Sequence, residues 1–266
     1  MMQDLVSIIM PSYNTAQYIA DSIRSVQAQT YENWELLIVD DCSTDDTDGV
    51  VTSFLSDPRI RYLKNAVNSG AAVSRNYALR EAKGRWIAFL DSDDLWFPEK
   101  LERQLAFMEE TGCHFSYTCY RQIDERSRPL GVTVRGPRHI TKAGMVRFCW
   151  PGCLTVMYDA QTVGLLQIPD IRKNNDYAMW LRVIEKADCC LLPEILASYR
   201  RRTGSISNQS YSRLIKWHYR LFRQAQGESG FLSAVHTAGN LVFGVYKKLR
   251  YVEHTSEDKE LTEDRL

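Results

Sequence analysis

The sequence predicts an α/β protein with a mixed, largely parallel central sheet and a helical appendage at its C-terminal end. Three observations support this fold class. Short apolar runs alternate with helix-like segments four times in the first half of the chain, a polar cluster follows each run, and two long helix-like segments come near the end. Strand and helix in alternation imply crossover units, whose strands are parallel and whose sheet is covered on both faces.

The first two apolar runs are typical of buried strands. Residues 5–10 (LVSIIM) lead into a PSYN turn, and residues 34–40 (WELLIVD) lead into an acidic segment. Between these strands, residues 19–26 carry isoleucine and valine at helical spacing. After the second strand we expect Thr44 to cap a helix with two aspartates in its first turn, where the helix dipole favours acids.

The next two units follow the same order. IRYLK at 60–64 predicts the third strand, and a helix of small residues is expected at 71–82. WIAFLD at 86–91 predicts the fourth strand, and Pro98 is expected at the first position of the following helix. These units complete the alternating half of the sheet.

The second half of the chain is less regular. HFSYTCY (114–120), LTVMYD (154–159) and ILASYRRR (195–202) have the composition of further strands. Residues 175–187 (NDYAMWLRVIEKA) predict a helix with one buried apolar face. No internal repeat is evident, so these elements are expected to extend the same sheet.

Composition and charge limit the kinds of function. The 266 residues contain 33 Lys+Arg and 33 Asp+Glu, so no global basic field attracts nucleic acid and any phosphate binding must be local. Seven cysteines, two of them adjacent and none in a CxxC pair, favour a reduced chain over a disulfide framework or a zinc site. Without a signal peptide or an apolar run of about 20 residues, the chain is expected in the cytoplasm, at most peripheral on the membrane.

The polar clusters predict a single site. In sheets of this kind ligands bind at the carboxyl ends of the strands. The clusters fall at those four ends, in chain order PSYN, DDCSTDD, NSGAAVSRN and DSDD. The sequence therefore places its polar side chains together at one edge of the sheet.

The acidic turn after the fourth strand is a candidate metal site. Asp91 and Asp93 are one residue apart, which places both carboxylates on the same side of an extended or turning chain. Mg²⁺ or Mn²⁺ takes one or two such carboxylates together with substrate phosphates. The alternatives are a solvated acidic loop, or Asp94 acting as a helix cap before Pro98.

Three further side chains are candidates for binding a nucleotide. Asp41 follows the second strand, where its carboxylate can accept hydrogen bonds from a nucleobase or a ribose, or can cap a helix. Tyr13 can stack on a base or lie half-buried beside its turn. Arg75 lies in the helix expected after the third strand, where it can meet phosphate or form a surface salt bridge.

Two charged positions in the second half have comparable alternatives. Asp176 lies in the first turn of a predicted helix, which suits either a cap or a catalytic carboxylate. The arginines at 200–202 precede glycine and serine and can bind phosphate if the loop folds over the site. The alternative for such a run of charge is a solvated face.

Together these segments resemble the family 2 glycosyltransferases, which have the GT-A (Rossmann-like) fold, especially bacterial enzymes of surface-polysaccharide synthesis. The resemblance covers residues 6–207 and rests on VSIIMPSYN, ELLIVDDCSTDDT, NSGAAVSRN, GRWIAFLDSDDLW, NNDYAMWL and YRRRTGSIS. It implies a metal-dependent hexosyltransferase, with Mn²⁺ or Mg²⁺ as cofactor. Such an enzyme moves a sugar, with inversion, from a nucleotide-sugar, usually a UDP-sugar, to a hydroxyl of a lipid-linked oligosaccharide for O-antigen or capsule.

The resemblance also implies roles for individual positions. It places Pro11, Tyr13 and Asp41 around the nucleobase, and Arg75 near the nucleotide. The run GCLTVMYD, Gly152–Asp159, matches the part of these enzymes that faces the acceptor.

The chemical steps fall on the remaining positions. Asp91 and Asp93 match the D-x-D element, in which the last aspartate holds the metal on the diphosphate, and Asp176 matches the general base. Many members have a histidine where this sequence has Arg202. Arginine cannot ligate a metal, but it can clamp phosphate as a fixed cation. The phosphate-binding role is therefore expected here without the extra metal ligand.

The expected domains combine the resemblance with the pattern of residues 209–266. Residues 1–208 form the glycosyltransferase domain, with a nucleotide-binding half at about 1–100 and an acceptor-binding half at about 101–208. Residues 209–251 form the helical appendage, and 252–266 form a disordered tail.

The appendage and the activity each leave alternatives. FLSAVHTAGNLVFGVYKKLR (231–250) combines apolar residues with a basic end, which suits contact with the cytoplasmic membrane face, packing on the catalytic domain, or a homodimer. A nucleotidyltransferase shares the architecture and the acidic site but usually has a glycine-rich basic loop after the first strand. A non-catalytic nucleotide-sugar binder is the alternative outside enzymes.

Overall fold

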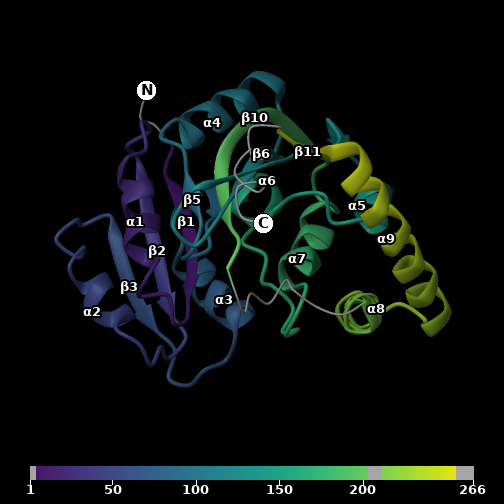
Figure 1. The fold of residues 1–266 in the computed structure, drawn as a ribbon, viewed down its shortest axis with the longest axis horizontal. Coiled ribbons are helices and arrows are strands. Elements are labelled where there is room, and N and C mark those ends of the chain that lie inside the picture. The colour runs from purple at the N-terminus through teal and green to yellow at the C-terminus, as the bar shows by residue number, and fades with distance from the viewer. Residues whose placement is uncertain (1–3, 203–210, 256–266) are drawn as a thin grey trace, which may run out of the picture.

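The computed structural model describes residues 4–202 and 211–255, which form one mixed sheet with helices on both faces (Figure 1). Its parallel half has the strand order β4-β1-β2-β3. These strands are β1 (Val6–Ser12), β2 (Trp34–Asp40), β3 (Ile60–Lys64) and β4 (Trp86–Phe89). The predicted α/β class with a largely parallel sheet is confirmed.

Helices follow the first three strands and the turn after β4, as the alternating pattern predicts. They are α1 (Ile19–Gln27), α2 (Thr47–Thr52), α3 (Ala71–Glu81) and α4 (Lys100–Thr111). Side chains along β1 alternate between two apolar clusters, since successive residues of a strand point to opposite faces. Ile9 packs on the side of α3, whereas Ile8 and Met10 pack on the side of α1.

The second half of the chain extends the sheet beyond β4. β9 (Met157–Asp159) pairs antiparallel with β4, and β6 (Phe115–Ile123) pairs antiparallel with β9. β10 (Cys189–Arg200) runs parallel to β6 over nearly its whole length. The shorter strands are β5 (Leu95–Trp96), β7 (Pro129–Val134) and β8 (His139–Ile140).

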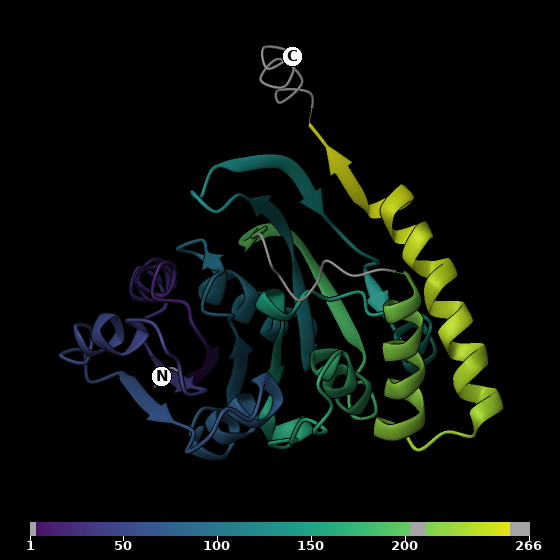
Figure 2. The ribbon, with the colours of Figure 1, turned by 60° about the horizontal axis from the view of Figure 1, so that its bottom comes forward.

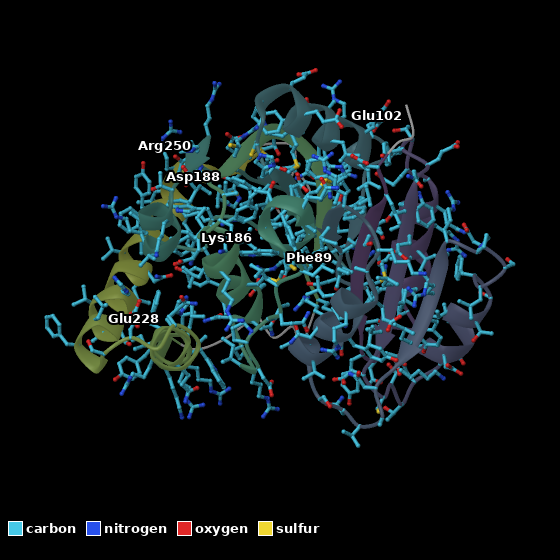
Figure 3. All side chains as sticks on the ribbon, turned by 180° about the vertical axis from the view of Figure 1, so that it is seen from behind. Phe89, Glu102, Lys186, Asp188, Glu228 and Arg250 are labelled. Atoms are coloured by element: carbon cyan, nitrogen blue, oxygen red, sulfur yellow. The ribbon has the colours of Figure 1, made fainter. Side chains whose placement is uncertain are left out.

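Short helices connect these strands, and one longer helix completes the core. The connections are α5 (Lys142–Arg147), a 3₁₀ turn at Cys153–Thr155 and α6 (Ala160–Val163). α7 (Asn175–Val183) packs its Trp180 edge-on against Phe89 of β4, with ring centroids 5.1 Å apart. Phe89 lies well inside the molecule (Figure 3).

Two helices near the C-terminal end lie side by side at the edge of the molecule remote from α1 (Figures 1 and 2). They are α8 (Tyr211–Arg220), continued by a π-helical segment at Leu221–Ala225, and α9 (Gly230–Tyr251). Both helices of the predicted appendage are therefore present. Among the described residues, no helix is long and apolar enough to cross a membrane.

The start of the predicted disordered tail is wrong. β11 (Val252–His254) pairs antiparallel with β7 and so joins the main sheet. Its backbone is ordered by this edge pairing, which a composition rich in charge does not reveal. The remainder of that prediction, residues 256–266, lies outside the described residues.

Other predicted boundaries are also corrected. β1 continues through Pro11 and Ser12 instead of turning at PSYN. This is tolerated because Pro11 lies beyond the end of β4, whose last residue, Phe89, pairs with Ile9; the missing N–H of Pro11 therefore interrupts no ladder there. α7 is shorter than the predicted 175–187 and ends at Val183.

Two predicted helix starts differ as well. Thr44 does not cap α2; its backbone N–H donates to Asn14 Oδ1 at 2.8 Å, and Asp46 occupies the cap position without a side-chain hydrogen bond. The two aspartates therefore precede the helix. α4 starts at Lys100, two residues after Pro98; the carbonyl of Pro98 accepts the N–H of Thr30, which lies between α1 and β2.

Candidate functional site

The acidic turn after β4 directs its three carboxylates in different directions. The N–H of Asp94 donates to the carbonyl of Asp91 at 3.0 Å and closes the turn. Asp94 is buried, whereas the side chains of Asp91 and Asp93 are 33% and 17% exposed. Only Asp91 and Asp93 are therefore accessible to a ligand.

Asp94 has a structural role that sequence reasoning missed. Its Oδ1 accepts the N–H of Arg200 at 2.8 Å, and the Arg200 Nε donates to the Asp93 carbonyl at 2.7 Å. These bonds fix the end of β10 against the acidic turn. Asp94 does not cap α4, and burial raises the pKa of its carboxyl well above the usual value.

Arg75 connects the acidic turn to α7. It lies buried on α3, forms an ion pair with Asp91 through NH2, and donates from NH1 to Asn175 Oδ1 at 2.7 Å. Burial acts to lower the pKa of Arg75, but Asp91 and Asp176 outweigh it, so this pKa lies above its usual value. The surface salt bridge that the sequence left open is thus excluded, because Arg75 is an interior cation. Its buried Nε has no hydrogen-bond partner among the described residues.

Asp176 lies in the first turn of α7, next to the residue that Arg75 holds. The preceding Asn174 has a positive φ of 55°, which turns the chain sharply into the helix. Burial raises the pKa of the Asp176 carboxyl above its usual value, opposed by Arg75 and the Tyr177 N–H, while Asp91 raises it further. A carboxylate with a raised pKa is a better proton acceptor near neutral pH.

Asp41 orders the loop that leads into α3. Its carboxylate accepts the N–H groups of Ser69 at 2.8 Å and Gly70 at 2.6 Å, and the side-chain amide of Asn65 at 2.7 Å. It does not cap α2. Among the described residues Oδ1 receives two of these bonds and Oδ2 receives one, which leaves Oδ2 a lone pair for one more donor.

The end of β1 places the other two nucleotide candidates beside Asp41. The N–H of Asp41 donates to the Ser12 carbonyl at 2.9 Å, which joins the ends of β1 and β2. Pro11 is buried within β1, and Tyr13 is 47% exposed just beyond it. Tyr13 therefore offers an open ring at this edge of the sheet.

The arginines at 200–202 have separate roles. Arg200 is buried, and its NH1 donates to the carbonyls of Asp124 and Glu125 and to Ser127 Oγ. Arg202 lies at the site, with its Nε 2.8 Å from Asp93 Oδ2. The following residues of the predicted phosphate loop, 203–207, lie outside the described residues.

The acidic turn fits a divalent cation bound together with phosphate. The described residues contain no group of three or more His, Cys, Asp or Glu side chains that could hold a metal unaided. Asp91 and Asp93 instead supply two hard oxygen ligands that are partly exposed and paired with Arg75 and Arg202. This donor set suits Mg²⁺ or Mn²⁺, which complete their coordination with water and substrate phosphate.

The candidate side chains thus fall into two connected groups. Asp91, Asp93, Arg75, Arg202 and Asp176 surround the end of β4, and Pro11, Tyr13 and Asp41 lie at the ends of β1 and β2. α3 links them, because its first turn approaches Asp41 and its body carries Arg75. Asn175 and Asn65 contact these candidates through Arg75 and Asp41; their only sequence signal is adjacency to Asp176 and to the end of β3.

The match to known sequences defines the class of protein. Residues 7–152 match the model of Glycosyl transferase family 2, which is more than half of the chain. The chain therefore belongs to this family, as the resemblance predicted. It is a glycosyltransferase, and the nucleotidyltransferase alternative is not supported.

Relatives and solved structures make the assignment more specific. The chain is 44% identical over 209 residues to TuaG of Bacillus subtilis (strain 168), named for teichuronic acid biosynthesis, covering 78% of this chain and 83% of that protein. It is 42% identical over 212 residues to the Escherichia coli UDP-Glc:alpha-D-GlcNAc-diphosphoundecaprenol beta-1,3-glucosyltransferase WfgD, covering 79% and 82%. S. aureus TarS 1-349 in complex with UDP-GlcNAc has the same fold, with a TM-score of 0.71 at 20% identity over 90% and 72% of the two chains. The predicted GT-A fold and the surface-polysaccharide type of glycosyltransferase are confirmed.

Proposed function

We propose that this chain transfers a sugar from a UDP-sugar to a hydroxyl of a lipid-linked saccharide, with inversion at the anomeric carbon. One observation supports the proposal most directly. The buried Arg75 forms an ion pair with Asp91 and a hydrogen bond with Asn175, so the acidic turn and the first turn of α7 lie next to each other. The relative WfgD is named for a UDP-glucose donor and a diphosphoundecaprenol-linked acceptor. The TarS structures contain UDP-GlcNAc and UDP.

The nucleotide would be held at the ends of β1 and β2. Asp41 Oδ2, with one lone pair free, would accept the N–H of the base, and the open ring of Tyr13 would stack on it. Pro11 would form the apolar floor. Arg75 would act from below the nucleotide, as a buried cation that holds Asp91 in place.

The diphosphate would lie between the acidic turn and Arg202. Asp93 would hold a divalent cation, with Asp91 supporting it, and this cation supplies Lewis-acid stabilisation of the leaving diphosphate when bound. Mn²⁺ and Mg²⁺ both suit these oxygen ligands, and a mannosyltransferase of this fold from Pyrobaculum calidifontis, PcManGT, contains Mn²⁺ with GDP-Man (TM-score 0.62, 17% identity). Arg202 would move from Asp93 to a phosphate oxygen.

The transfer itself would need one base. Asp176 would take the proton of the acceptor hydroxyl as that oxygen forms its bond to the anomeric carbon. The bond from this carbon to the phosphate oxygen breaks on the opposite face, and its electrons stay with the departing UDP. A single displacement of this kind inverts the configuration.

The test of this proposal is the Asp176→Asn variant. Amide replaces carboxylate with little change in shape, so UDP binding measured by calorimetry is expected to stay within about twofold. Transfer to an undecaprenyl-diphosphate-linked acceptor is expected to fall about 10²–10⁴-fold, because a positioned base contributes that much. Normal transfer by the variant would exclude Asp176 as the base.

The donor is identified by a panel of UDP-sugars assayed for UDP release. We expect release from one sugar, lost with chelator and with Asp93→Ala. Loss of UDP release in the variant while Mn²⁺ binding persists would contradict the role of Asp93. Absence of both turnover and UDP binding across the panel would instead favour a non-catalytic protein.

A further inference from the structure

α9 meets the protein through a mixed face, in which polar residues take the most buried positions and Phe243 packs beside them on Trp150. The fully buried positions of this helix are Ser233, Thr237 and Asn240. Lys247 lies on the same side, two turns further along, with its ammonium group against the protein. An amphipathic helix of a globular protein normally buries the opposite, apolar face.

The inward face of α9 makes specific contacts. Asn240 Nδ2 donates to the Val146 carbonyl at 3.0 Å and to the Tyr177 hydroxyl at 3.2 Å. Lys247 Nζ donates to the Trp150 carbonyl at 2.8 Å. Gly244 lets the ring of Phe148 approach so closely that a Cβ would lie 3.2 Å from it. These bonds define which side of the helix faces the protein.

The opposite side of α9 is an exposed apolar stripe. Its residues recur at spacings of four and three, which keeps them on one line along the helix. We call this set the outer face of α9: Phe231, Val235, Ala238, Val242, Val245 and Leu249. Leu249 is 82% exposed and Val242 67%. A continuous stripe of this kind marks a docking surface.

α8 widens the stripe. Ile215 and Tyr219 of α8 are exposed and line a shallow groove with Ala234, Ala238 and Leu241 of α9. Figure 2 shows the two helices next to each other along this edge of the molecule. In Figure 3 the labels Glu228, just before α9, and Arg250, in its last turn, show how far the helix extends.

Charge indicates the partner. Residues 211–251 contain seven Lys and Arg and one acid, Glu228, a net charge of +6 in a chain whose total is zero. Glu228 is paired with His236 at 2.9 Å. Five of the basic side chains are exposed: Arg213, Lys216, Arg223, Lys248 and Arg250. A second copy of this chain would bring the same positive charge, whereas anionic lipid headgroups would neutralise it.

We propose that the outer face of α9 and the exposed apolar residues of α8 dock on an anionic lipid surface. The helix would lie in the plane of the interface with its apolar stripe among the acyl chains and its basic residues at the headgroups. Asn240 would connect this helix to Tyr177, the neighbour of Asp176 on α7. The docking itself does not depend on the proposed function.

The test is co-sedimentation of the full chain with phosphatidylcholine vesicles that contain or lack phosphatidylglycerol. Wild type is expected to pellet with the anionic vesicles and to be released by salt. Val242→Glu is expected to weaken binding at least about tenfold, since it removes buried apolar area and adds a like charge. Val67→Glu is the matched control, because Val67 is equally exposed at 67% but lies near α3, and it should bind as wild type does.

Charge is tested separately with Lys248→Ala. This variant is expected to bind about fivefold more weakly at low salt and to lose part of the salt dependence. Unchanged thermal unfolding of Val242→Glu and Lys248→Ala shows that both are folded. Wild type that stays in the supernatant overturns the proposal, whether it is a dimer in sedimentation velocity or a monomer. Equal pelleting of Val242→Glu and wild type also overturns it.

Discussion

The guanidinium of Arg202 lies on Asp93, the carboxylate proposed to hold the cation, at 2.8 Å. In the donor-free protein the arginine and the cation would therefore compete for one carboxylate. Once UDP is present, the arginine has a phosphate to bind and the competition ends. Arg202 would then weaken the binding of the cation alone and strengthen the binding of the nucleotide.

Arg202→Ala tests this competition. We expect Mn²⁺ alone to bind up to about fivefold more tightly, since a partly exposed ion pair contributes about 0–1 kcal/mol. We expect UDP with Mn²⁺ to bind about tenfold or more weakly, because a charged hydrogen bond to phosphate is lost. Calorimetry measures both. Arg201→Ala is the matched control: the Arg201 side chain is exposed, and its backbone N–H keeps its bond to Ile123. If Arg202→Ala binds Mn²⁺ more weakly than wild type in the absence of UDP, while Arg201→Ala does not, Arg202 does not compete with the cation.

The pKa of Asp176 sets the expected pH dependence of transfer. Burial raises this pKa, Arg75 opposes the rise and Asp91 adds to it. His218 also faces the carboxyl, but burial lowers the pKa of His218 and so favours its neutral form. A base acts only when deprotonated, so the rate falls as pH falls through the raised pKa. The acid limb of kcat should therefore lie above the usual aspartate value of about 4. A limb at or below that value, measured with saturating Mn²⁺ and UDP-sugar, would contradict the role of Asp176 as the base.

At the scale of elements, the four parallel strands were predictable because each is a short apolar run between polar turns. The polar cluster after each strand located the site for the same reason. The contact of Arg75 with Asn175 joins residues a hundred positions apart and leaves no local signal. Short edge strands such as β8 and β11 depend on their partners and could not be predicted from composition.

α9 shows a different limit of sequence patterns. Its periodicity predicts a helix with one apolar stripe, but periodicity does not say which side meets the protein. Asn240 and Lys247 decide that, because their hydrogen-bond partners are the Val146 and Trp150 carbonyls of another segment. Buried polar groups with fixed partners thus orient this helix.

Asn240→Ala tests how α9 is packed on the rest of the protein. The change removes two hydrogen bonds inside the protein, and we expect a loss of about 1–3 kcal/mol of unfolding free energy. For a chain of this size, each kcal/mol corresponds to about 2–4 °C in Tm. Gly239→Ala is the control, since a Cβ there meets nothing within 4 Å and alanine favours the helix. Equal Tm values for Asn240→Ala and wild type would show that α9 is held by other contacts.

At the scale of the whole molecule, β11 brings the end of the described chain back to the main sheet and adds a strand to its edge. It pairs with β7, an outer strand in which Leu130 is exposed. Around this pairing the Arg135 N–H donates to the Tyr251 carbonyl at 2.8 Å, and the Thr255 N–H donates to Gly131 at 2.9 Å. Since β11 directly follows α9, the strand ties the C-terminal end of that helix to the sheet.

Truncation tests how much β11 contributes to stability. A chain ending at Tyr251 loses the strand and the ion pair between Arg135 and Glu253, whereas a chain ending at Thr255 keeps both. Each lost backbone hydrogen bond contributes about 0.5–1.5 kcal/mol, so we expect the shorter chain to melt several degrees lower. It should also aggregate more readily, because an unpaired edge strand recruits other chains. Thermal unfolding and light scattering of the two chains measure these effects, and the chain ending at Thr255 is the control that keeps β11. If both truncations melt at the same temperature, β11 makes no contribution to stability and α9 is held by its inward face alone.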